Sequence, residues 1–112
     1  MEKQFKKLLK DIKSRPGVYF GKKDLDSLIT FLWGYVACLE QSYDVSFLVG
    51  FQGFVEKYYK ISGFWNWVQI VCFFNVDEDS AFDCFFELLK QFEKEGGKII
   101  SISGDNLNSK AH

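Results

Sequence analysis

The stretch RPGVYFGKKDL, Arg15–Leu25, decides where the first two predicted helices of this chain end and begin. It contains the only proline of the chain. Proline pushes the residue before it out of the α-helical region, and Gly17 favours a turn, so the first helix must end by Ser14 or Arg15. Asp24 is a typical N-cap residue and predicts the start of the second helix. The stretch is therefore expected to be a stiff connection, with Val18, Tyr19 and Phe20 pinned to the core.

Apolar side chains recur at helical spacing on both sides of this connection. The pattern predicts helices over residues 2–14, 24–42, 45–60, 64–74 and 80–93. Gly34 lies in the middle of the second helix and predicts a close helix crossing there. A weak capping box from Ser80 to Asp83 follows an acidic segment, and Gly96 and Gly97 end the last helix.

Two segments are ambiguous in the sequence. Residues 64–74, FWNWVQIVCFF, are apolar almost all round, so a strand stays open beside the favoured helix. Residues 98–103, KIISIS, fit a short strand or a packed tail. We predict an all-α fold: one compact domain of about five helices over residues 1–103, followed by a flexible polar tail over 104–112.

Composition supports a single domain with a large aromatic core. The chain has 112 residues, of which 47% are hydrophobic and 19% aromatic, including 13 Phe. Charge is unevenly spread, because residues 1–23 carry +6 and residues 24–93 carry −8. The N-terminal lysines lie between the apolar positions of the first helix, so we interpret them as its solvated face.

Several function classes find no support in the residues. Cys38, Cys72 and Cys84 lie far apart within apolar runs, which predicts buried free thiols in a reducing cytosol rather than a metal site. The sequence has no apolar signal segment and no stretch long enough to span a membrane. The only histidine is His112, so a Ser–His or Cys–His catalytic pair is close to excluded. We therefore expect no enzymatic activity, no catalytic residue, no cofactor and no metal.

The same opening stretch does not match the motifs of nucleotide-binding sites. RPGVYFG resembles the RPGMYIG segment of gyrase B ATPases, but the following helix lacks the Asn and the well-placed Glu that those enzymes use. A phosphate-binding loop also fails, because Gly17 and Gly21 are too close and Lys22 is followed by Lys23. We interpret the two lysines as solvated loop residues, although an anion near the second helix is conceivable.

Acidic residues around the start of the last helix form the best candidate site. We predict a partner-binding patch of Asp77, Glu78, Asp79, Asp83 and Glu87, which would attract a basic protein. For each residue taken alone, helix capping and solubility are the stronger explanation of its acidic side chain. The chain is also richer in Trp and Tyr than a core requires, and one or two of these are expected to anchor a partner. The candidates are Trp33, Trp65, Trp67, Tyr43, Tyr58 and Tyr59.

The helix–RPGxYxG–helix opening, LITFLWGY at 28–35, GFxxFV at 50–55 and AFDxFFELL at 81–89 together resemble a family of small bacterial immunity proteins. That family belongs to toxin–immunity loci, including contact-dependent growth inhibition systems. The resemblance implies a cytoplasmic protein that binds a cognate toxin domain, in many cases a basic nuclease, and covers its active site. No direct contact with nucleic acid and no membrane contact are expected.

Two alternatives remain beside this hypothesis. The lysine-rich face of the first helix is compatible with a small nucleic-acid-binding or regulatory module. A purely structural subunit of an oligomer is also compatible with the sequence, which does not determine the oligomeric state.

Overall fold

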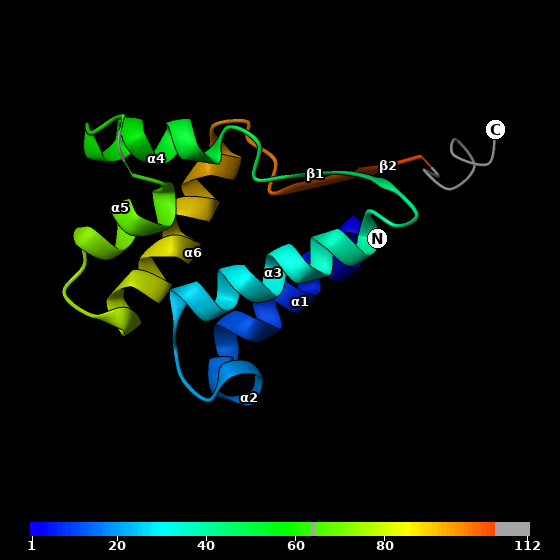
Figure 1. Cartoon of the computed structure of the whole chain (residues 1–112), viewed down its shortest axis with the longest axis horizontal. Coiled ribbons are helices and arrows are strands. Elements are labelled where there is room, and N and C mark those ends of the chain that lie inside the picture. The colour runs from blue at the N-terminus through cyan, green and yellow to red at the C-terminus, as the bar shows by residue number, and fades with distance from the viewer. Residues whose placement is uncertain (64, 105–112) are drawn as a thin grey trace.

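A computed structural model describes residues 1–63 and 65–104 of the chain. Within these residues six helices and two strands follow one another (Figure 1). Their bounds are α1 Glu2–Ser14, α2 Pro16–Phe20, α3 Leu25–Leu39, β1 Asp44–Phe47, α4 Phe51–Tyr59, α5 Trp67–Phe73, α6 Glu78–Lys94 and β2 Ile100–Ser103. The prediction of a mostly helical fold is confirmed, but the fold is not purely all-α, because it contains two strands.

The connection between the first two predicted helices contains a helix of its own, α2. Pro16 occupies its first turn, where a missing N–H costs nothing and the fixed φ is already helical. Gly21 ends it with a left-handed φ of 77°. The connection therefore turns through a short helix rather than a stiff loop. Val18 is 71% exposed, so its expected contact with the core is wrong, while Tyr19 and Phe20 do pack partly against the core.

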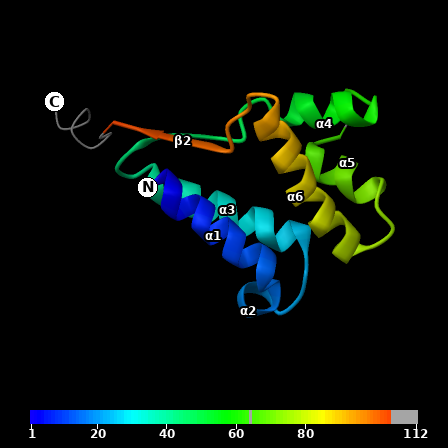
Figure 2. The same cartoon turned by 180° about the vertical axis from the view of Figure 1, so that it is seen from behind.

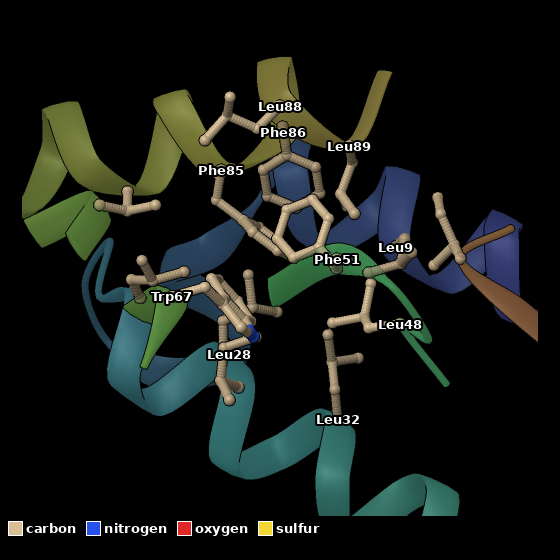
Figure 3. Close-up of a cluster of buried hydrophobic side chains, with 14 of the residues drawn as sticks. Leu9, Leu28, Leu32, Leu48, Phe51, Trp67, Phe85, Phe86, Leu88 and Leu89 are labelled. Carbon is tan, nitrogen blue, oxygen red and sulfur yellow. The ribbon is translucent and has the colours of Figure 1, made fainter. Parts of the chain in front are cut away.

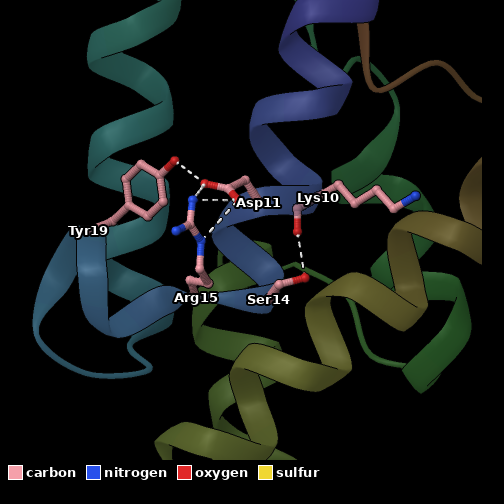
Figure 4. A network of polar contacts seen from close by, with 5 residues as sticks. All are labelled: Lys10, Asp11, Ser14, Arg15 and Tyr19. Carbon is pink, nitrogen blue, oxygen red and sulfur yellow. Dashed lines mark hydrogen bonds and ion pairs between the residues drawn. The ribbon is translucent and has the colours of Figure 1, made fainter.

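A polar network ties α2 back to α1 (Figure 4). The Tyr19 hydroxyl donates a hydrogen bond of 2.6 Å to the Asp11 carboxylate, and Arg15 donates to the same carboxylate at 2.8 Å. The Arg15 and Tyr19 hydrogen bonds hold the pKa of Asp11 below its ordinary value. One carboxylate thus fixes the corner at which the chain leaves α1.

Strands β1 and β2 form a two-stranded antiparallel ribbon, in which Val45 lies opposite Ile102 and Phe47 opposite Ile100. Figures 1 and 2 show the ribbon over the end of the α1–α3 pair at which α1 begins. The helix predicted from Val45 is wrong for its first six residues, because Leu48 and Gly50 both have positive φ, 54° and 86°. The strand alternative for residues 98–103 is confirmed over Ile100–Ser103.

The core is built mainly from aromatic and leucine side chains (Figure 3). Phe51 is fully buried at its centre, with ring centroids 4.9 Å from Trp67 and 5.2 Å from Phe92. Helix α5 confirms the helical interpretation of residues 64–74 for Trp67–Phe73 only, and Phe64 lies outside the described residues. Asn66 and Gln69 start α5 with a reciprocal capping box.

Helix α6 begins three residues earlier than its predicted capping box. Asp77 is the N-cap, and its carboxylate accepts a hydrogen bond of 2.7 Å from the Ser80 N–H. Ser80 and Asp83 therefore do not form the predicted box. The helix ends at Lys94, and Gly96 follows with φ 96°, as the glycine pair predicted. The flexible tail predicted over 104–112 lies outside the described residues from 105 on, and the single domain over 1–103 stays a prediction.

Candidate functional site

Five aromatic rings from α4, α5 and the segment between them form a continuous strip on the surface. We call this set the aromatic strip: Tyr58, Tyr59, Trp65, Phe73 and Phe74. Neighbouring ring centroids lie 4.5–5.1 Å apart, from Trp65 through Phe73 and Phe74 to Tyr59 and Tyr58. Phe73 and Tyr58 are 64% and 57% exposed. Tyr59 is half-buried and links Tyr58 to the other rings, which are exposed. A row of mostly exposed rings is typical of a binding surface rather than of an ordinary exterior.

The short length of α5 explains why these rings stay outside. Trp67, Ile70 and Val71 face the core and are buried, which uses the inward side of a seven-residue helix. Phe73 and Phe74 fall on the remaining sides, and no described element covers them. Trp65 and Phe73 also line a surface hollow of about 390 Å³ together with Gln69 and Cys72.

The five predicted acidic residues all lie on the surface, from the N-cap to the middle of α6. We call Asp77, Glu78, Asp79, Asp83 and Glu87 the acidic cluster. Asp79, Asp83 and Glu87 follow one another at i, i+4 spacing and therefore share one stripe of the helix. Asp77 differs in role, because its hydrogen bonds from Ser80 cap the helix and lower the pKa of its carboxyl.

Two members of the acidic cluster are paired within the chain. Lys23 Nζ lies 3.2 Å from Asp83, and Lys22 Nζ lies 3.7 Å from Glu78. Lys22 and Lys23 are loop residues at the surface, as predicted, but both also pair with carboxylates of α6. Asp79 and Glu87 make no ion pair in the described part of the chain. The five carboxylates and two lysines leave a net charge of −3 on this surface.

The aromatic strip and the acidic cluster adjoin along α6. The Tyr59 hydroxyl lies 3.1 Å from the Cys84 sulfur, one residue after Asp83. Tyr58 lines a hollow of about 140 Å³ together with Cys84 and Glu87. At the other end, Phe74 is three residues before Asp77, and Val76 between them is 89% exposed. The two features thus make one face, which we call the aromatic–acidic face.

The Cys72 thiol and the Tyr59 hydroxyl on this face stay protonated at neutral pH. Burial, followed by the Cys84 hydrogen bond, raises the pKa of Tyr59. Burial also raises the pKa of the Cys72 thiol, with further contributions from Asp26, Asp24 and Glu78. Neither group is thus an activated nucleophile, and the anionic groups here are carboxylates.

The cysteines differ from the expectation of buried thiols. Cys38 and Cys72 are exposed and Cys84 is half-buried, although all three are free. The apolar residues around the cysteines do not indicate burial here, because the outward sides of α3 and α5 are themselves apolar. Among residues 1–63 and 65–104, no three His, Cys, Asp or Glu side chains come together as a possible metal site.

The other predicted aromatic anchors lie elsewhere. Trp67 is buried at 8% exposure and belongs to the core. Trp33 is 50% exposed, but it contacts Phe47 of the ribbon at a centroid distance of 5.1 Å. Tyr43 is half-buried. Phe73 is the most exposed ring of the strip, yet neither Phe73 nor Phe74 was among the predicted anchors, because the apolar run over residues 64–74 has no periodic pattern that marks its exposed rings.

The lysine face of α1 is partly engaged within the chain. Lys6 Nζ forms an ion pair of 3.0 Å with Glu93, and Lys13 Nζ lies 5.9 Å from the Phe86 ring centroid. Lys7 and Lys10 line a shallow hollow beside Asp11 and Tyr19. No exposed ring of the aromatic strip lies among these lysines.

Comparison of the chain with protein-family models, with curated proteins and with solved structures gave no match. The class that the fold and the site define is a mostly helical protein with a small β-ribbon and one exposed aromatic–acidic face. In the described residues no helix has both the length and the apolar character needed to cross a bilayer.

Proposed function

We propose that the chain is a non-enzymatic immunity protein, which binds a cognate toxin domain through its aromatic–acidic face and covers the toxin's active site. The observation that carries the proposal is the exposed aromatic strip adjoining the acidic cluster. Aromatic anchors supply most of the affinity in protein interfaces, and surrounding charges steer the partner and set its orientation. The resemblance in the sequence motifs supports the immunity class and a cytoplasmic location.

The charge of the face favours a basic partner. Its carboxylates would occupy positions that nucleic-acid phosphates take on a nuclease, and would compete with that substrate. The nucleic-acid alternative for this chain has less support, because Lys6 and Lys13 already contact α6 and no exposed aromatic side chains interleave with the lysines of α1.

The experiment is a binding measurement between the full chain and the toxin domain encoded by the neighbouring gene. We expect 1:1 binding that weakens with salt and blocks the toxin's activity in growth and in vitro assays. Phe73→Ser with Phe74→Ser should reduce affinity at least about a hundredfold, as removal of hot-spot side chains does. The matched control is Trp33→Ser with Val49→Ser, which removes equally exposed apolar groups outside the face.

Charge reversal tests the acidic part separately. Asp79→Lys should slow association, whereas Asp44→Lys on strand β1 makes the same charge change away from the face. These variants leave the Asp77 cap and both lysine ion pairs intact. If both charge variants bind alike, the acidic cluster is not part of the interface, and retardation of DNA or RNA by the chain would favour the alternative.

A further inference from the structure

A groove of about 240 Å³ runs between α1 and α6, on a side of α6 different from the aromatic–acidic face. Phe86, Leu89, Lys90 and Glu93 line it at i, i+3, i+4 and i+7, so they form one stripe of α6. Leu9, Lys10 and the neighbouring lysines of α1 form the opposite wall. In the described residues no other helix lies over this groove.

The floor of the groove is apolar. Leu9, Phe86, Leu89 and Ile99 line it, and each of them is at most 9% exposed. The little apolar surface that they show lines the same groove as the lysine side chains. Only a ligand that enters the groove can cover it.

The rim of the groove is cationic. Lys6, Lys10, Lys13 and Lys90 line it, and Glu93 is the single carboxylate. Lys6 neutralises Glu93 at 3.0 Å, which leaves three lysine charges, and Lys13 Nζ already lies 5.9 Å from the Phe86 ring centroid. Positive charge thus lines the same groove as the apolar side chains, and at Lys13 it lies over the Phe86 ring, an arrangement that complements an anion with an apolar body.

The geometry argues against larger anionic partners. A bilayer cannot use the floor, because side chains so deeply buried cannot insert into a flat surface. Single-stranded nucleic acid needs exposed rings on which bases stack, and Phe86 is the only ring in the groove and is 9% exposed.

We propose that this groove binds a small amphiphilic carboxylate, with its head between the rim lysines and its alkyl or aryl body on the apolar floor. The volume holds about eight groups of the size of water, which matches a short-chain body rather than a long acyl chain. This site is independent of the aromatic–acidic face, so either proposal can fail without the other.

The test is a titration of the full chain with octanoate below its micelle-forming concentration, followed by amide NMR shifts. We expect saturable 1:1 binding, with the largest shifts at Leu89 and Ile99. Lys13→Gln with Lys90→Gln should weaken it about tenfold or more, the effect of losing roughly 1.4 kcal/mol of interaction. Lys3→Gln with Lys7→Gln, which removes two lysines of α1 outside the groove, should leave it unchanged.

Octanol and anionic phosphatidylglycerol vesicles are titrated as two comparison ligands. Octanol presents the same body without the charge and should bind more weakly than octanoate. Absence of saturation, equal binding of octanol, or an equal loss in both lysine variants overturns the proposal. Binding to the vesicles without binding to octanoate also overturns it and indicates a membrane surface instead.

Discussion

Lys23 and Asp83 lie sixty residues apart in the sequence, yet the Lys23 ammonium nitrogen is 3.2 Å from both carboxylate oxygens of Asp83. Together with Lys22 and Glu78, this pair joins the connection between α2 and α3 to the first half of α6. The same two lysines reduce the negative charge of the acidic cluster from −5 to −3. Loop lysines therefore limit the attraction between this face and a cationic partner.

Removing both lysine charges should strengthen the acidic field at little cost in stability. Lys22→Gln with Lys23→Gln is expected to change the free energy of unfolding by about 1 kcal/mol or less, because the pairs are largely exposed. A lysine-rich peptide should bind the variant more tightly than the native chain at low salt, and equally at about 1 M salt. Unchanged peptide affinity at low salt would show that the lysines do not shield the cluster.

Asp77 should contribute to stability in a pH-dependent way. Its folded-state pKa is below the ordinary value of 3.8, because Ser80 donates hydrogen bonds to the ionised carboxylate. The contribution is therefore fully present above about pH 4 and is lost as pH falls through the lowered folded-state pKa. Asp77→Ala should lower the urea midpoint at neutral pH.

Asp77→Asn is the matched control for this prediction, since Asn caps helices as well as Asp does but does not titrate. Asp77→Asn should keep most of the stability at neutral pH. Its stability relative to Asp77→Ala should not change as the pH is lowered, whereas that of the native chain should fall. If Asp77→Asn is as unstable as Asp77→Ala at neutral pH, the capping hydrogen bond is not the cause.

Two glycines should respond to alanine in opposite directions. Gly34 lies in α3, and an added Cβ there meets nothing within 4 Å, so the predicted close helix crossing is wrong. Gly34→Ala should therefore stabilise the chain by about 0.4–1 kcal/mol through helix propensity and reduced unfolded-state entropy. At Gly97 an added Cβ would come within 2.4 Å of the Phe92 ring.

Gly97→Ala should destabilise the chain by about 1–3 kcal/mol, because Phe92 packs against Phe51 and must shift. Denaturant unfolding of the two variants beside the native chain measures both effects, and each variant controls for the other. Equal effects of the same sign would mean that the contact between residue 97 and Phe92 does not determine the stability there.

The sequence patterns predicted the long helices well, because their signals are local. Phe82, Phe85, Phe86, Leu89 and Phe92 repeat at helical spacing, and α6 follows that repeat. A strand over residues 98–103 was one of the predicted alternatives, but its partner β1 was missed, because the two pair across more than fifty positions and Leu48 breaks the helical pattern only through its backbone conformation.

The candidate site was only partly predictable for the same reason. The acidic residues are adjacent in sequence and their exposure follows from helix α6. The lysine pairs with Glu78 and Asp83, and the stacking of Tyr59 on Phe74, depend on tertiary packing. The apolar run has no polar side, so no periodic pattern shows which of its rings are exposed. Phe73 and Phe74 could therefore not be distinguished from the buried Trp67 by sequence.

Cys72 offers a chemical reporter for the aromatic–acidic face. The residue is exposed as a whole, but its thiol is partly buried beside Trp65 and Phe73, and this partial burial, followed by the Asp26 carboxylate, raises the pKa of the thiol. Because the thiolate is the reactive form, alkylation by iodoacetamide at pH 7 should be slower than that of an ordinary exposed thiol. The alkylation rate should continue to rise at pH values at which the rate of an ordinary thiol has levelled off. Peptide mass spectrometry separates this site from the other two cysteines.

Asp26→Asn should speed alkylation of Cys72 at pH 7, because it removes one of the carboxylates that disfavour the thiolate. Asp44→Asn, on strand β1, removes an equal charge that does not act on this thiol and should leave the rate unchanged. A bound toxin domain on the aromatic–acidic face should protect Cys72 and leave Cys38 reactive. Full reactivity of Cys72 in a tight complex would place the interface on another surface of the protein.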